Sequence, residues 1–152
     1  MAFLLMLIPL ALMMISDGRT RTVSVVWLAA LFLATAVGSV LAYGIKNALA
    51  FTVINMAILL ILGLALYAYS LIRKKHLGDL GGVGDALFFA AITPMSAPED
   101  YVRYVLAMLV FSLLLWMVLR KRISLSTIPL VSFCGIPLVS IILYLGIRQW
   151  TL

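Results

Sequence analysis

The chain has 152 residues, of which 66% are apolar and only 11% are charged, and its mean hydropathy is +1.25. Soluble domains have about 45–50% apolar and about 25% charged residues, so the composition excludes an ordinary soluble domain and predicts an integral membrane protein. A membrane-spanning helix takes about 20 residues, so six such helices would use about 120 residues and leave no length for a second, soluble domain.

Five polar interruptions divide the apolar sequence into six predicted membrane spans. The fourth has about 13 residues and would cover only about 20 Å, so it either extends into the preceding loop or is buried among its neighbours. We expect an all-α protein with a single six-helix domain over residues 1–152. In chain order the predicted spans are Met1–Ser16, Val23–Tyr43, Ala48–Ile72, Asp85 to between Pro94 and Pro98, Asp100 or Tyr101 to Leu119, and Ile128–Ile147.

The N-terminal segment is apolar but has neither a basic region nor a small-residue cleavage site, so we interpret it as a retained first helix rather than a signal peptide. The single cysteine, Cys134, has no partner for a disulfide within the chain, and together with the single histidine it cannot form a Cys- and His-rich zinc site.

The net charge of +6 resembles that of a nucleic-acid-binding protein, but the basic residues lie in short loops, where they are typical of topology signals. We therefore expect no nucleic-acid partner. Eight basic residues fall on one side of the predicted spans and three on the other, which predicts that both termini lie outside and that the three basic loops lie in the cytosol. The eight are Arg19, Arg21, Arg73, Lys74, Lys75, Arg120, Lys121 and Arg122; the three are Lys46, Arg103 and Arg148.

Two of the five acidic residues lie where an apolar span meets the cytosolic face. Asp17 ends the first span and Asp85 opens the fourth. A carboxylate near hydrocarbon costs about 2.5–3.5 kcal/mol, so it usually faces a bundle interior and has a function there. Two carboxylates that meet can share one proton, which leaves one as a base and its partner as an acid. Of the others, Asp79 is expected in a turn, and Asp100 as the N-cap of the fifth span beside Glu99.

Glycines gather immediately before Asp85, and Gly82–Asp85 reads GVGD. Glycine permits close approach of another backbone and turns that a side chain would forbid. The alternative is a flexible loop that only joins two helices. The glycines concerned are Gly78, Gly81, Gly82 and Gly84.

We also make predictions for polar residues within the spans and for residues that can kink a helix. Interhelical hydrogen bonds are the expected role of Thr35, Ser39, Asn55 and Ser112. Gly135 and Pro137 are expected to kink the sixth span.

Three segments of the chain resemble the type IV prepilin peptidases and archaeal preflagellin peptidases, which are intramembrane aspartyl proteases of the GxGD type. They are ISDGRTRTVSVVWLAAL at 15–31, GGVGDALFFAAI at 81–92 and TIPLVSFCGIPLVSIILYLG at 127–146. The chain would be a minimal member without the cytosolic cysteine-bearing segment of many bacterial relatives. It departs from the family pattern at Val23–Val25 and at Leu87.

The resemblance implies peptide hydrolysis by Asp17 and Asp85 acting on one water molecule, with no metal or organic cofactor. The implied substrate is a prepilin-like membrane protein, cut between its basic cytosolic leader and its apolar helix. The enzyme would lie in the cytoplasmic membrane with its active site at the cytosolic face, and the loop from Gly78 to Gly84 is our candidate for gating the substrate.

A different class of function stays open beside the protease. The chain could be a non-proteolytic membrane protein, either a small transporter that uses the two aspartates as proton carriers or an inactive scaffold of a secretion assembly. The protease is favoured because no central acidic residue in the second, third, fifth and sixth spans continues a proton path across the membrane.

Overall fold

The computed structural model describes residues 2–20, 24–73, 83–119 and 130–148, and over these ranges the chain is helical and has no strand. The all-α prediction is confirmed for this part of the chain, and each of the six predicted spans contains a helix. The helical elements are η1 (Ala2–Met6), α1 (Leu7–Thr20), α2 (Val25–Tyr43), α3 (Ile45–Arg73), α4 (Val83–Ala91), η3 (Thr93–Met95), α5 (Pro98–Leu119) and α6 (Leu130–Arg148).

Three of these helices, α2, α3 and α5, are long and apolar enough to cross a membrane by length and composition. The other apolar stretches, Phe3–Asp17, Val83–Met95 and Val131–Ile147, are shorter. α3 is the least covered by protein, since Ala48, Asn55 and Ser70 are its only buried residues. Large apolar side chains are exposed on every long helix, and such a surface fits hydrocarbon better than water.

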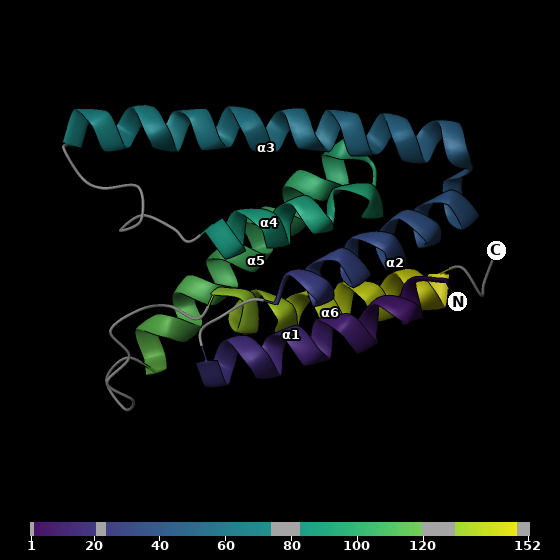
Figure 1. Ribbon diagram of the computed structural model, residues 1–152, viewed down its shortest axis with the longest axis horizontal. Helices are drawn as coiled ribbons and strands as arrows, with labels where there is room; N and C mark the ends of the chain where they lie inside the picture. The colour runs from purple at the N-terminus through teal and green to yellow at the C-terminus, as the bar shows by residue number, and fades with distance from the viewer. Residues whose placement is uncertain (1, 21–23, 74–82, 120–129, 149–152) are drawn as a thin grey trace.

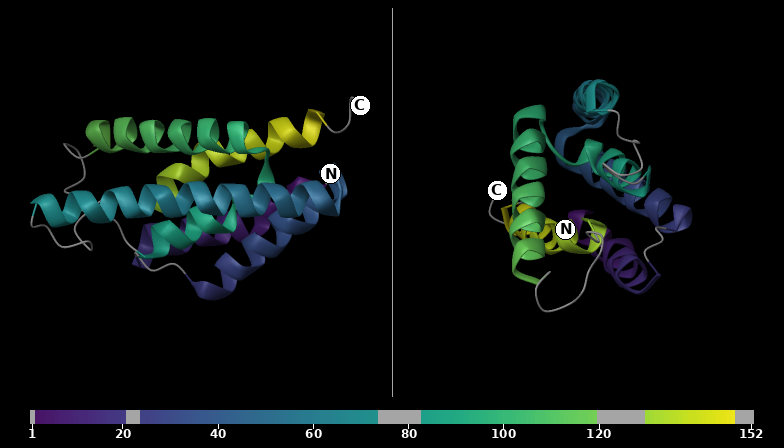
Figure 2. Two further views of the ribbon diagram at one scale, coloured as in Figure 1. Left: turned by 90° about the horizontal axis from the view of Figure 1, so that it is seen from above. Right: turned by 90° about the vertical axis from the view of Figure 1, so that its left-hand side faces the viewer.

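Successive helices run in opposite directions, so their ends gather at two ends of the molecule (Figure 1). The C-terminal ends of α1, α3 and α5 lie toward the left of Figure 1 with the N-terminal ends of α2, α4 and α6. The start of η1 and the end of α6 lie at the opposite end. α3 forms one edge of the bundle, and α4 lies between it and the layer of α1 and α6 (Figures 1 and 2).

Two predicted helix boundaries are wrong. The interruption predicted at 44–47, between the second and third spans, is not a loop, because Gly44 alone separates α2 from α3. The φ of Gly44 is 80°, a conformation that favours glycine. α5 begins at Pro98, whose missing N–H costs nothing in the first turn of a helix. Asp100 therefore lies inside the first turn rather than at the N-cap, and its carboxylate forms an exposed ion pair with Arg103 at 3.4 Å.

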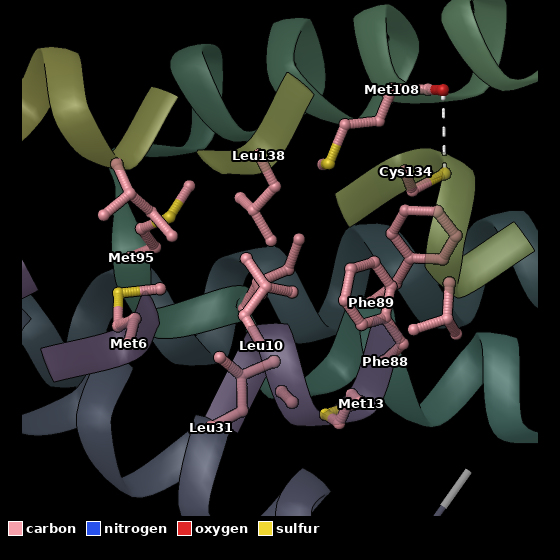
Figure 3. Packing of buried hydrophobic residues seen from close by; sticks show 14 of the residues in the cluster. Met6, Leu10, Met13, Leu31, Phe88, Phe89, Met95, Met108, Cys134 and Leu138 are labelled. Atoms are coloured by element: carbon pink, nitrogen blue, oxygen red, sulfur yellow. Dashed lines mark hydrogen bonds between the residues drawn. The ribbon is translucent and has the colours of Figure 1, made fainter. Parts of the chain in front are cut away.

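The core is formed by buried apolar side chains from all the helices except α3, and methionine is prominent among them. Met6, Met13, Met95 and Met108 are fully buried, and an unbranched thioether fills irregular gaps between helices. Figure 3 shows these side chains around Leu10, Leu31 and Leu138, with Phe88 and Phe89 of α4 pointing into the same cluster. α4 is therefore packed from several sides although it has only nine residues.

α4 ends inside the bundle, and the carbonyl groups of its last turn have no partner within the helix. Two side chains from neighbouring helices supply the missing donors. The hydroxyl of Thr35 on α2 lies 2.7 Å from the Ala91 carbonyl and equally close to the Phe32 carbonyl of its own helix, so it donates to one of the two at a time. The hydroxyl of Tyr101 on α5 donates to the Phe89 carbonyl at 3.1 Å. The second half of the short fourth span is thus buried among its neighbours, whereas its extension into the preceding loop falls outside the described residues.

The turn that follows α4 is also buried, and a single amide on α3 holds it. Asn55 Nδ2 donates to the carbonyls of Thr93 at 2.7 Å and Ser96 at 2.9 Å. The prediction of interhelical hydrogen bonds is confirmed for Thr35 and Asn55. It is wrong for Ser39, whose buried hydroxyl has no hydrogen-bond partner in the described part of the chain.

We expect Asn55→Leu to lower the free energy of unfolding by about 1–3 kcal/mol, because two buried carbonyls lose their donor. Asn47→Leu is the matched control, since Asn47 lies on the same helix and its exposed amide donates only to the Tyr43 carbonyl. Equilibrium unfolding in mixed detergent micelles measures both. Equal losses in the two variants would contradict the assigned role of Asn55.

Candidate functional site

Asp17 lies in the last turn of α1 and is only 6% exposed. The helix continues for three more residues, to Thr20. Oδ2 of Asp17 accepts two hydrogen bonds from one residue of α6, from the backbone N–H of Ser132 at 2.9 Å and from its hydroxyl at 3.0 Å. The first helix is therefore joined to the last one through this carboxylate.

The start of α6 explains why a carboxylate can be buried at this point. Ser132 is the third residue of the helix, and the first four N–H groups of a helix have no partner within it. These groups also carry the partial positive charge of the helix dipole. Asp17 thus caps α6 from a different helix, and the donors offset the cost of removing the carboxylate from water.

Asp85 is the third residue of α4 and is half-buried. It lies in the first turn of the helix, where a negative charge is favourable. The helix that carries it contacts α6. The start of α4 lies at the same end of the molecule as the end of α1 (Figure 1).

α6 is therefore in contact with both helices that carry the aspartates. Asp17 is hydrogen-bonded to Ser132, and Asp85 lies in the first turn of α4. Gly84 precedes Asp85 inside α4. The other three glycines of the predicted gating loop, Gly78, Gly81 and Gly82, lie outside the described residues, so their role stays a prediction.

Cys134 is buried between α5 and the aromatic side chains of α4 (Figure 3). Its thiol contacts the Met108 carbonyl at 3.6 Å, and the hydroxyl of Ser112 lies beside it. Contacts between α5 and α6 thus hold the thiol in the bundle. By hydrogen-bond geometry the buried hydroxyl of Ser112 has no partner among the described residues, so the interhelical hydrogen bond expected of it is not formed.

α1 and α6 approach each other closely beside Asp17. A Cβ on Gly135 would collide with the side chain of Met14, and the hydroxyl of Ser132 contacts the Met14 carbonyl at 3.0 Å. Gly135 was expected to kink α6. In the structure, the missing side chain at Gly135 leaves space for Met14, and α6 continues as a helix through Pro137.

Ser132 and Met14 were not among the candidate residues chosen from the sequence. The only available signal for Ser132 was a polar residue near the start of an otherwise apolar helix, where serine often serves as a cap. Nothing in the sequence distinguishes Met14 from the other methionines.

The remaining polar residues form no further site in the described ranges. No group of three or more His, Cys, Asp or Glu residues comes together there to hold a metal ion. Arg73 lies 5.8 Å from the ring of Tyr69 on the exposed face of α3, which fits an anchor at a membrane surface. His76 lies outside the described part of the chain.

Comparison of the chain with protein-family models, with curated proteins and with solved structures found no match.

The cap role of Asp17 predicts different effects for two substitutions. Asp17→Ala leaves the Ser132 N–H without an acceptor and should lower the free energy of unfolding by about 1–3 kcal/mol. Asp17→Asn keeps an acceptor oxygen and should cost less than about 1 kcal/mol. Asp100→Ala, at an exposed ion pair, should stay within about 1 kcal/mol of the parent. Unfolding in detergent would contradict the cap if Asp17→Ala behaved like Asp100→Ala.

The contact between Gly135 and Met14 predicts a coupled pair of substitutions. Gly135→Ala should destabilise the protein by about 1–3 kcal/mol through overpacking. Combining it with Met14→Ala should cost less than the sum of the two single changes, because the added methyl group then has space. Gly63→Ala is the control, since nothing lies within 4 Å of a Cβ there. Strict additivity in a double-mutant cycle would refute the contact.

Proposed function

We propose that the chain is an intramembrane aspartyl endopeptidase of the prepilin-peptidase type, with six spans in the cytoplasmic membrane and both termini outside. Support for this orientation comes from the eight basic residues assigned to one side of the membrane and the three assigned to the other. Asp17 and Asp85 then lie near the cytosolic surface, where the basic leader of a precursor is located.

The observation that carries the proposal is that the two helices with Asp17 and Asp85 both contact α6. An apolar bundle places few carboxylates in its interior without a function for them. Here Asp17 is hydrogen-bonded to α6, and the start of α4, which carries Asp85, lies at the same end of the bundle as the end of α1. Such an arrangement would let the two carboxyl groups bind one catalytic water molecule between them.

In the proposed reaction, one carboxylate removes a proton from water as the water oxygen attacks the scissile carbonyl carbon. The other carboxyl group donates a proton toward the carbonyl oxygen and stabilises the negative charge that develops on it. When the tetrahedral intermediate breaks down, the carboxyl group that took a proton from water donates it to the leaving nitrogen, and the peptide C–N bond is broken. The other carboxylate takes a proton back from a hydroxyl group of the intermediate, so both groups return to their starting states.

The proposed substrate is a small membrane protein with a basic cytosolic leader and an apolar helix, cut at their junction. The scissile segment must be extended, because a helix engages its carbonyls in internal hydrogen bonds. The glycines from Gly78 to Gly84 remain our candidate for admitting that segment, since glycine lets another backbone come close.

One observation favours a second candidate, a scaffold without protease activity. Asp17 makes two hydrogen bonds that by themselves account for a buried carboxylate as a helix cap. In a scaffold, Asp17 would hold α1 against α6, and Asp85 would only stabilise the positively charged N-terminal end of α4.

A cleavage assay with isosteric variants separates the two candidates. The full chain and a prepilin-like precursor are co-expressed in a bacterial host that lacks its own prepilin peptidase, and loss of the leader is followed by gel shift and mass spectrometry. We expect the wild type to cleave, and Asp17→Asn and Asp85→Asn each to reduce the rate by at least about 100-fold. Asp100→Asn, at an exposed acidic residue, should cleave like the wild type.

The asparagine variants suit this test because the amide of Asp17→Asn retains an acceptor for the cap but cannot take up a proton from water. Cleavage by both variants at the wild-type rate would rule out the aspartyl dyad. If the correctly folded wild type cleaved none of a panel of pilin-like and archaellin-like precursors, the scaffold would replace the protease as the better explanation.

A further inference from the structure

The hydroxyl of Ser132 lies between two oxygen atoms of α1. It is 3.0 Å from the backbone carbonyl of Met14 and 3.0 Å from Oδ2 of Asp17. A hydroxyl group has a single hydrogen and can donate it to only one acceptor at a time. The two equal distances therefore describe two alternative hydrogen-bond arrangements rather than two simultaneous donations.

In the first arrangement Asp17 is ionised. Its Oδ2 then accepts both the backbone N–H and the hydroxyl hydrogen of Ser132, and the Met14 carbonyl retains only its helical partner. This arrangement satisfies the carboxylate with two donors from the positive end of α6.

In the second arrangement Asp17 carries a proton on Oδ2. That proton can be donated to the oxygen of Ser132, whose own hydrogen rotates to the Met14 carbonyl. The Asp17 proton, the Ser132 hydroxyl and the Met14 carbonyl then each have a partner. The change between the two arrangements requires rotation of one hydroxyl hydrogen and displacement of no heavy atom.

We infer that Ser132 is a positioning residue that holds the Asp17 carboxyl group in one place whether or not it carries a proton. The catalytic consequence of this inference rests on the proposed function. In an aspartyl protease each carboxyl group gains and loses a proton during the cycle, so its position must not depend on its charge. A rotating hydroxyl meets that requirement because it is both a donor and an acceptor.

A purely structural role of Ser132 makes a different prediction. Its backbone N–H alone caps Asp17 in the ionised state, and no side chain is needed for that. The hydroxyl would then be dispensable for catalysis, and its removal would affect stability alone. The two roles therefore differ in what happens when only the hydroxyl group is removed.

Ser132→Ala removes the hydroxyl group and keeps the N–H, Ser132→Thr keeps a hydroxyl group, and Ser140→Ala removes an exposed serine from the same helix. In the cleavage assay we expect Ser132→Ala to lower kcat about tenfold with KM nearly unchanged, as for loss of one hydrogen bond to a charged group. Ser132→Thr should restore most of the rate, and Ser140→Ala should match the wild type.

Infrared spectroscopy of the full chain in lipid tests the same inference without relying on activity. The C=O band of the protonated Asp17 carboxyl group is identified by its loss in Asp17→Asn. In Ser132→Ala this band should move to higher frequency, because the carboxyl proton has lost its acceptor. Ser132→Thr and Ser140→Ala should keep the wild-type frequency.

An unchanged band in a folded Ser132→Ala protein would overturn the inference, and so would a band in Ser132→Thr that matched the alanine variant. If the wild type cleaves and Ser132→Ala has the wild-type kcat, the inference fails while the proposed protease stands. If the wild type cleaves nothing, the proposed function fails, and the band position still decides the role of Ser132.

Discussion

The arrangement of the candidate site depends on one interaction, the hydrogen bonds between the Asp17 carboxylate and the first turn of α6. They join the first and last helices and bring a charged group into an apolar bundle. The start of α6 needs acceptors and Asp17 needs donors, so each offsets the other's cost of being buried. The close approach of Met14 to Gly135 lets the two helices come near enough for these bonds to form.

A second constraint determines the position of α4, the helix that carries Asp85. α4 is too short to cross a bilayer, and its end lies inside the bundle, so its free carbonyls must find donors within the protein. Donors for α4 and for the turn after it come from three different helices, on which Thr35, Asn55 and Tyr101 lie. These contacts fix the far end of α4, and thereby the position of the helix that carries Asp85. The polar side chains concerned serve the backbone of this segment rather than a path across the membrane.

Much of the fold could be predicted from the sequence, because apolar runs of membrane length and short basic interruptions are local signals. The predicted helices and the positions of Asp17 and Asp85 near helix ends follow from these signals. The errors at Gly44 and Pro98 are also local: a single glycine suffices to end one helix before the next, and proline starts a helix as readily as an aspartate caps one. Ser132 was missed because its role depends on a residue 115 positions away.

The order of residues alone specifies a helical, apolar chain with two acidic residues at the ends of apolar segments. Which side chains meet those acidic residues depends on how the helices pack. In a soluble helix the apolar face indicates the side that packs, but in a bundle suited to lipid the outer and inner faces are about equally apolar. The sequence pattern therefore does not indicate which face of α6 turns toward α1, and the contact of Ser132 with Asp17 becomes visible only when the helices are packed together.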